Sequence, residues 1–357
     1  MSIEIPKFDL MDNDNEIIIL VNMAIFTFDG NKWNSILIND SKLPNSDVGN
    51  LLKPSLAEIY QPKEKKEKLL ILTGGFNTNQ KSSSKTTYVL NLKTDSQNCF
   101  LDLKFDDLNY SRFMHCSVNI QNKFILVIGG KTEKNFVTKN EILDINEKKW
   151  KNFPELLNPK ANFSFCLINE NNLFLYGGFE ANGKYAENKL TNCLIDVNDF
   201  NKSVWKNINL KGDDLNLLPL ACINLIPNDD NFYICGGSNG KEIIDLIFEI
   251  NPTEETVEKI GKLNTPRSNY HMLMNNGNYF LIGGNVKEFK KNENNTEITN
   301  YIEKFSFDLN NEIINSLISI KSDDIIKPLL DLNIIKSINM YKQEPGFPFS
   351  ASLLSKK

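Results

Sequence analysis

The stretch LLILTGG, residues 69–75, is an apolar run that ends in two glycines, and the chain repeats this pattern four more times. The copies are FILVIGG ending at Gly130, LFLYGG at Gly178, FYICGG at Gly237 and YFLIGG at Gly284. A self-similar unit of roughly 50 residues is typical of a propeller or a solenoid. The repeat therefore decides the fold before any local motif is considered.

Each copy predicts a buried β-strand with a tight exit. Four to six consecutive residues of the Ile, Leu, Phe and Tyr type, stopped by glycines, indicate a strand that is buried on both faces. Glycine adopts positive φ and lets a second backbone approach closely. We therefore expect the same inner strand and the same glycine exit in every unit.

Further strands are predicted around each glycine pair. Downstream, two apolar stretches separated by a turn recur, as in NEILDI (140–145) followed by a strand that opens with Trp150. Upstream, one more strand is predicted in each unit, at 53–60, 112–120, 160–168, 218–226 and 267–274. Each unit is thus expected to be four short antiparallel strands, the blade of a propeller.

This pattern resembles the kelch-repeat β-propeller family. The family's marks are the Gly-Gly pair after an apolar strand, and a downstream aromatic residue and Trp separated by a short turn. The glycine pair is present in all five copies, and the Trp in two of them, at Trp150 and Trp205. The resemblance covers essentially the whole chain and implies an all-β fold with a single kelch β-propeller domain over residues 1–357.

A sixth blade is predicted from the two ends of the chain. Residues 16–21 (EIIILV) match the apolar strand, and residues 24–30 and Trp33 supply two outer strands. The stretch PFSASLL, 348–354, resembles the upstream strand of the other units. We expect it to join the N-terminal blade and close a six-bladed ring, which would remove open sheet edges. Residues 321–346 do not follow the pattern and are expected to form a short helix or a lid.

Composition restricts the class of protein. A net charge of −5 and a pI near 5.4 argue against nucleic-acid and membrane binding. The first residues contain acids and no signal-peptide core, and no stretch approaches the length of a membrane span, so a cytoplasmic protein is expected. The 6 cysteines lie in predicted strands without C-x-x-C pairing, which favours buried reduced thiols over disulfides or zinc.

The sequence shows no familiar catalytic motif. It contains no G-x-S-x-G, H-E-x-x-H, P-loop or G-x-G-x-x-G pattern, and it predicts no cofactor and no metal. The 2 histidines, His115 and His271, fall in the same predicted strand of different blades and are expected to be structural. Some kelch propellers are enzymes, so the resemblance leaves one alternative, a mutarotase-like enzyme that acts on a small polar molecule such as a sugar.

Cations recur where the first strand of a blade is predicted to begin. Arg112 and Lys160 each lie 17 residues before their glycine pair (129 − 112 and 177 − 160), and Arg267 lies 16 before (283 − 267). Lys53 is expected to take the same place. Circular repetition would gather these cations around the mouth of the channel.

The family resemblance implies that arginines at this place line a mouth that captures acidic peptide motifs. An Arg fork can hold a carboxylate with two hydrogen bonds, and several cations around a mouth reinforce one another. The alternative is that these residues pair with acidic loops between blades. Trp33, Trp150 and Trp205, each at the start of an outer strand, are expected to pack between blades rather than bind a ligand.

The sequence therefore predicts a non-catalytic scaffold that binds a partner protein or an acidic peptide through loops on one propeller face. Lys53, Arg112, Lys160 and Arg267 are the predicted binding residues. Analogy with other kelch proteins suggests a cytoskeletal or ciliary component as the partner.

Overall fold

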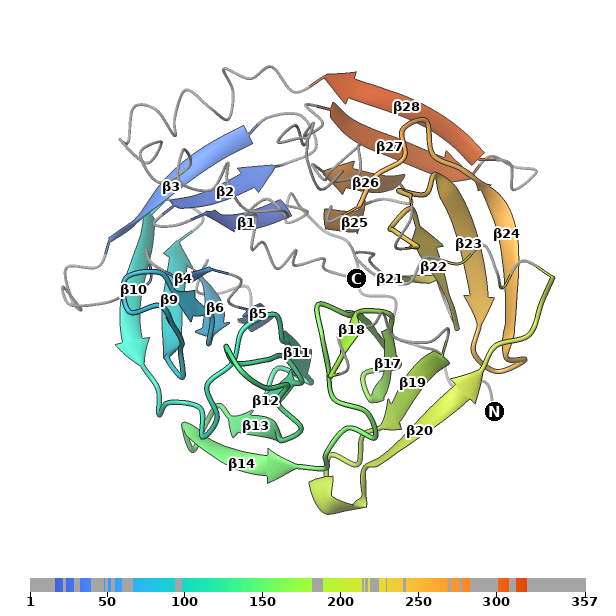
Figure 1. The fold of residues 1–357 in the computed structure, drawn as a ribbon. Helices are drawn as coiled ribbons and strands as arrows, with labels where there is room; N and C mark the ends of the chain where they lie inside the picture. Colours follow the sequence, from blue (N-terminus) through green and yellow to red (C-terminus); the bar gives the residue numbers. More distant parts are fainter. Residues whose placement is uncertain are drawn as a thin grey trace, which may run out of the picture.

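The computed structural model shows an all-β protein whose sheets lie around a common centre (Figure 1). It describes residues 17–21, 24–28, 33–39, 48, 51–52, 55–59, 67–93, 98–181, 189–213, 215, 218, 225–228, 230–239, 242–268, 271–275, 278–282, 301–307 and 313–319. A short 3-10 helix, η3, spans Phe200–Lys202.

Four sheets of the described chain have the same antiparallel, four-stranded order. The first is β11 (Cys116–Ile120), β12 (Phe124–Ile128), β13 (Asn140–Asp144) and β14 (Lys149–Phe153). The second is β16 (Ser164–Ile168), β17 (Asn172–Tyr176), β19 (Lys189–Leu194) and β20 (Val204–Asn209). The third is β21 (Leu225–Asn228), β22 (Asn231–Cys235), β23 (Leu246–Asn251) and β24 (Thr256–Lys262). The fourth is β25 (His271–Asn275), β26 (Asn278–Ile282), β27 (Tyr301–Phe307) and β28 (Ile313–Ser319).

The N-terminal units are joined in one sheet. Its order is β1 (Ile17–Val21), β2 (Ala24–Phe28), β3 (Trp33–Asn39), β10 (Asn98–Lys104), β9 (Thr87–Lys93), β6 (Glu67–Thr73) and β5 (Ser55–Ile59). All neighbours are antiparallel except β3 and β10, which pair in parallel through Cys99 with Ile38 and Phe100 with Asn39. A parallel bond between outer strands thus links the first two units.

Two small sheets lie at the ends of the larger ones. One is β4 (Leu51–Leu52), β7 (Phe76–Asn77) and β8 (Ser82–Ser83). The other is β15 (Lys160–Ala161) and β18 (Phe179–Glu180). Both contain residues that directly follow a glycine pair, so the glycine exits carry short paired segments rather than open loops.

The apolar strands predicted before the glycine pairs are confirmed as β6, β12, β17, β22 and β26. Each is the second strand of its unit in the sheet order, and β25 lies inside β26 in Figure 1. The predicted starts of the first strands were wrong for β11, β16 and β25, which each begin four residues after the cation. Met114 (φ 56°) and Asn162 (φ 55°) interrupt the extended backbone before two of these strands. Residues 321–346 and the predicted closing strand, 348–354, lie outside the described residues.

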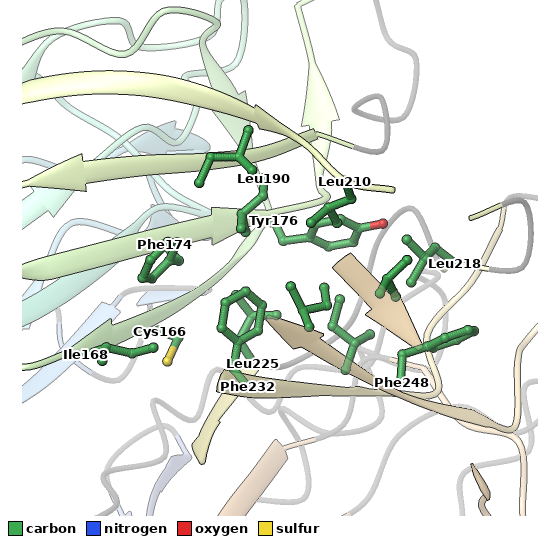
Figure 2. Close-up of a cluster of buried hydrophobic side chains, with 14 residues drawn as sticks. Cys166, Ile168, Phe174, Tyr176, Leu190, Leu210, Leu218, Leu225, Phe232 and Phe248 are labelled. Carbon is green, nitrogen blue, oxygen red and sulfur yellow. The ribbon is translucent and has the colours of Figure 1, made fainter. Parts of the chain in front are cut away.

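Strand β17 shows why the apolar runs are continuous. Leu173 and Leu175 pack in a cluster with the β11–β14 sheet, whereas Phe174 and Tyr176 pack in a cluster with the β21–β24 sheet. Figure 2 shows this second cluster, in which the Phe174 and Phe232 rings lie 5.5 Å apart between their centroids. Since successive side chains point to opposite faces, a strand between two neighbouring sheets is apolar at every position.

The glycine pairs form the seam between neighbouring sheets. The N–H of the second glycine donates to a carbonyl of the next sheet: Gly75 to Arg112 at 2.8 Å, Gly130 to Lys160 at 2.9 Å, and Gly237 to Arg267 at 2.8 Å. A Cβ on the preceding glycine would lie 2.5 Å from that carbonyl at Gly74, and 2.6 Å at Gly129 and Gly236. A side chain at the first glycine would therefore break the seam.

Two tryptophans add a second link between neighbouring sheets. The Trp150 indole N–H donates to the Asp106 carbonyl at 2.8 Å, and that of Trp205 donates to the Pro154 carbonyl at 2.9 Å. Each acceptor follows the outer strand of the preceding unit. The packing role predicted for these two side chains is confirmed.

Gly129→Ala should destabilise the protein by at least about 2 kcal/mol, because it combines positive φ with a backbone clash. Its φ is 58° and the new Cβ would meet the Lys160 carbonyl. Gln121→Ala is the matched control, since Gln121 has a φ of 54° in an exposed hairpin. Chemical denaturation measures both variants. An equal, small effect of the two substitutions would show that close approach at the seam is unimportant.

Candidate functional site: the long-loop face

The glycine exits and the segments that enter each sheet lie at the same end of the strands. We call this end the long-loop face and define it by residues 74–86, 105–115, 129–139, 154–163 and 177–181. In an antiparallel sheet, the end of the second strand, the start of the first and the start of the third share one end. The opposite end carries hairpins such as 121–123 and 145–148. All predicted binding residues in the described chain belong to the seam at the long-loop end.

Arg112 lies inside the protein and not on an open mouth. It is 0% exposed, and its Nη2 lies 2.7 Å from Oε1 of Glu141, whose side chain is also 0% exposed. Its guanidinium also donates to the carbonyls of Gly129 and Lys139, each at 2.9 Å. Burial lowers the pKa of Arg112, and the charge of Glu141 acts in the opposite direction.

Glu141 is the buried partner of Arg112, and the sequence pattern did not mark it. Besides Arg112, its carboxylate accepts hydrogen bonds from the Asn109 N–H at 2.6 Å and the Tyr110 N–H at 3.2 Å. It therefore fixes the segment that enters the β11–β14 sheet. The alternative offered for the cations was pairing with acidic loops between blades, whereas the partner of Arg112 lies in strand β13 of the same sheet.

Lys160 and Arg267 hold the same position in their own sheets, four residues before the first strand. Both are buried, with exposed fractions of 3% and 0%. Nζ of Lys160 lies 3.3 Å from Oγ1 of Thr191, and burial lowers the pKa of this lysine. Nη1 of Arg267 donates to the Leu281 carbonyl at 3.2 Å. Lys53 lies outside the described residues.

The structure thus brings three of the four predicted cations to equivalent seam positions. Each directs its carbonyl to the preceding sheet and engages its side chain with its own sheet. Their role in direct partner binding stays a prediction.

His115 lies in a buried polar network between β6 and β11. It is 9% exposed, its Nε2 lies 2.9 Å from Oγ1 of Thr73, and that hydroxyl lies 2.8 Å from Oγ of Ser117. A Cβ on either Gly74 or Gly130 would lie 2.7 Å from the histidine, so the ring fills the space between two glycine pairs. Burial, and secondarily the charge of Arg112, hold the pKa of His115 well below its usual 6.5.

Two loops of this face carry its exposed lysines, whereas the exposed acids Asp106, Asp107 and Glu155 lie in other segments of it. Residues 76–86 contain Lys81 and Lys85, and residues 131–139 contain Lys131, Lys134 and Lys139; the acid in these two stretches is Glu133. Lys131 is half-buried and the other four lysines are exposed. Glu133 accepts hydrogen bonds from the backbone N–H and the hydroxyl of Ser83, and thereby ties the two loops together. The two loops together form a lysine-rich surface on a chain whose net charge is −5.

Aromatic side chains lie beside these lysines. The Phe76 and Phe113 rings contact edge to face with centroids 5.4 Å apart, and Nζ of Lys131 lies 5.4 Å from the centroid of the Phe113 ring. Both rings are half-buried. The surface therefore offers an ammonium group against partly exposed apolar area, which suits an acidic segment with apolar neighbours.

Other kinds of site find little support in the described chain. Its residues contain no group of three or more His, Cys, Asp or Glu side chains that could hold a metal ion. In the same residues, no helix is long and apolar enough to cross a membrane. Cys99, Cys116, Cys166, Cys193 and Cys235 are free and buried, as the sequence predicted for them.

The repeated four-stranded sheets and their glycine seams define a β-repeat protein. Residues 64–284 match the family described as the KLHDC2/KLHL20/DRC7 Kelch-repeats domain, and the chain belongs to this kelch-repeat family.

Viral kelch proteins are among its relatives. They include the Kelch repeat and BTB domain-containing protein 1 of vaccinia virus (strain Copenhagen), protein A55 of the same description from strain Western Reserve, and protein 1 of cowpox virus (strain GRI-90 / Grishak). Each is 22% identical over 228 residues, which is 62% of this chain and 37% of the relative. The chain therefore spans little more than a third of the length of these relatives.

Arg112→Met should destabilise the protein by about 3–5 kcal/mol, because it leaves the Glu141 carboxylate buried without its counter-charge. Lys151→Met is the control, since the Lys151–Glu147 pair is about half exposed and should contribute less than about 1 kcal/mol. Adding Glu141→Met to Arg112→Met should cost less than the sum of the single effects. Denaturation midpoints measure all four variants, and additive single effects would contradict the coupling.

His115 should make the stability of the protein fall at acidic pH. The folded-state pKa is lower than the usual 6.5 of the unfolded state, so the unfolded state binds more protons below that pH. The contribution is complete above about pH 6.5 and is lost as the pH falls. Between pH 7 and pH 5 the wild type should lose more stability than His115→Gln. The two proteins have the same carboxylates, so the difference between them reports on the histidine. Parallel stability curves for the two proteins would contradict this assignment.

Proposed function

We propose that this chain is a non-catalytic protein-binding module whose partner presents an acidic segment to the long-loop face. Membership of the kelch-repeat family supports the general role, since kelch domains are typically protein-binding modules. The single observation that carries the specific proposal is the lysine-rich pair of loops, 76–86 and 131–139.

Charge and rigidity both favour this surface. The two loops contain five lysines and one glutamate; because Lys139 pairs with Glu155, the excess is three positive charges, on a chain whose net charge is −5. Opposite potentials speed association and select among partners. Hydrogen bonds hold both loops: Ser84 N–H donates to the Gly75 carbonyl at 2.7 Å, and Val137 N–H donates to the Gly130 carbonyl at 2.9 Å. A held loop loses little conformational entropy when a partner binds.

Arg112, Lys160 and Arg267 support binding indirectly in this proposal. Their carbonyls hold the glycine exits from which the long loops start. We retain the six-bladed, closed ring as part of the proposal, with residues 348–354 as the closing strand of a single domain. A cytoplasmic scaffold with a cytoskeletal or ciliary partner also stays a proposal, based on analogy with kelch proteins.

Reversing the loop charges should weaken binding of an acidic partner while the fold is retained. The test variant is Lys81→Glu/Lys85→Glu/Lys134→Glu, and the probe is a fluorescent polyglutamate peptide. We expect affinity to fall by at least about tenfold, and the wild-type affinity to fall as salt is raised. Lys123→Glu/Lys149→Glu, on exposed residues at the hairpin end of the β11–β14 sheet, is the matched control and should bind like the wild type.

The same three proteins should then be used to capture partners from a lysate of the source cells. A partner retained by the wild type and the control, and lost from the triple variant, supports the proposal. Equal retention of partners and of the peptide by all three proteins would contradict it. Thermal unfolding of each variant shows that the comparison is made between folded proteins.

A further inference from the structure

A pocket of about 350 Å³ lies beside the long-loop ends of the two outer strands β13 and β14. Asn140 at the start of β13 and Phe153 at the end of β14 line it, together with Tyr110 from the segment that enters the same sheet. Asn201, from η3 of the following unit, also lines it. The lysines of the proposed test variant do not line it.

Hydrogen bonds from two neighbouring units fix several residues that line this pocket. The Asn140 amide accepts from the Gly129 N–H at 3.1 Å and donates to the Pro154 carbonyl at 2.7 Å. The Trp205 indole donates to the same carbonyl. The buried Glu141 carboxylate holds the backbone of Tyr110. A site built on such a frame needs little reorganisation when a ligand binds.

Several polar groups that line the pocket are available to a ligand. Tyr110 is 40% exposed, and no residue of the described chain hydrogen-bonds its hydroxyl or the side chain of Asn152. Lys139 and Glu155 form an ion pair at the opening, with side chains 48% and 47% exposed. A pair this exposed contributes little to stability, so a ligand can insert between its members.

The chemistry of the lining favours an uncharged ligand with many hydroxyl groups. The charged residues of the lining are Lys139 and Glu155, which neutralise one another. Lys139 donates, Glu155 accepts, and Asn152 does both. A hydroxyl can also do both, so a ring that carries several hydroxyls matches this alternation. The ring face of Tyr110 can pack against the C–H groups of such a ligand.

We propose that this pocket is a binding site for a neutral, polyhydroxylated small molecule of about the size of one sugar ring. Pockets that hold small molecules have volumes from about 300 Å³ upward, so the volume fits one such ring rather than an extended peptide. The site shares Lys139 with the proposed protein-binding surface but none of the lysines of its test variant, and it involves binding alone, with no reaction.

The test measures binding of D-glucose, D-galactose and D-mannose by saturation-transfer NMR on the full chain. We expect transfer from the wild type to at least one sugar, with a dissociation constant in the millimolar range, about 1–10 mM. Tyr110→Ala and Asn152→Ala should each weaken binding by about tenfold, which corresponds to loss of one good contact. Asn146→Ala, in the exposed hairpin at the other end of β13 and β14, is the control and should bind like the wild type.

No saturation transfer to any of the three sugars would overturn the proposal, as would equal binding by all variants. Polyglutamate binding separates the two proposals, because Tyr110→Ala and Asn152→Ala should leave it unchanged. Binding of the acidic peptide in place of the sugars, lost in Tyr110→Ala, would show that the pocket belongs to the protein-binding surface instead. Thermal unfolding checks that both variants fold.

Discussion

One hydrogen bond, repeated between neighbouring sheets, sets the position of nearly everything on the long-loop face. It runs from the N–H of the second glycine of a pair to the carbonyl of the residue four positions before the next sheet. The approach is close enough that the first glycine can carry no side chain. Because the strand before the glycines is buried on both faces, it cannot shift to relieve a clash. The entry to each sheet is therefore placed by the exit of the preceding one.

The seam also separates structural charge from surface charge. With its backbone fixed between two sheets, Arg112 has its guanidinium directed into its own sheet, where Glu141 and backbone carbonyls surround it. A buried charge is tolerable only when it is paired and hydrogen-bonded in this way. Four of the five lysines of the long loops lie beyond the seam and are exposed to water. The cations that the sequence marks by position thus differ from those that lie open to a partner.

The sequence was sufficient to predict the repeating elements because their signals are local. The apolar run with its glycine pair, and the tryptophans of the outer strands, each specify a conformation within a few residues. The predicted first residues of β11 and β16 were wrong because Met114 and Asn162 adopt positive φ. A methionine gives no sequence signal for this conformation. The seam between the sheets holds the backbone of both residues in this conformation. Such a tertiary constraint cannot be predicted from local propensity.

Burial of Arg112 could not be predicted from spacing alone, because its partner Glu141 lies 29 residues away in another strand. The register of the strands gives a signal from which this ion pair could have been predicted. Glu141 pairs with Val127, two residues before Gly129, and Glu303 pairs with Leu281, two residues before Gly283. These are the two units with arginine at the seam. In the unit with Lys160 the same register position holds Thr191, so the acid accompanies arginine.

Amide hydrogen exchange at the second glycines tests the seam most directly. The N–H groups of Gly75, Gly130 and Gly237 lie at sheet ends, where exchange is ordinarily fast, yet they donate hydrogen bonds that join neighbouring sheets. NMR should show them as slowly exchanging as amides in the middle of β12, opening only when the sheets separate. If they exchange as fast as the exposed hairpin amide of Gln121, the glycine pairs do not hold the sheets together.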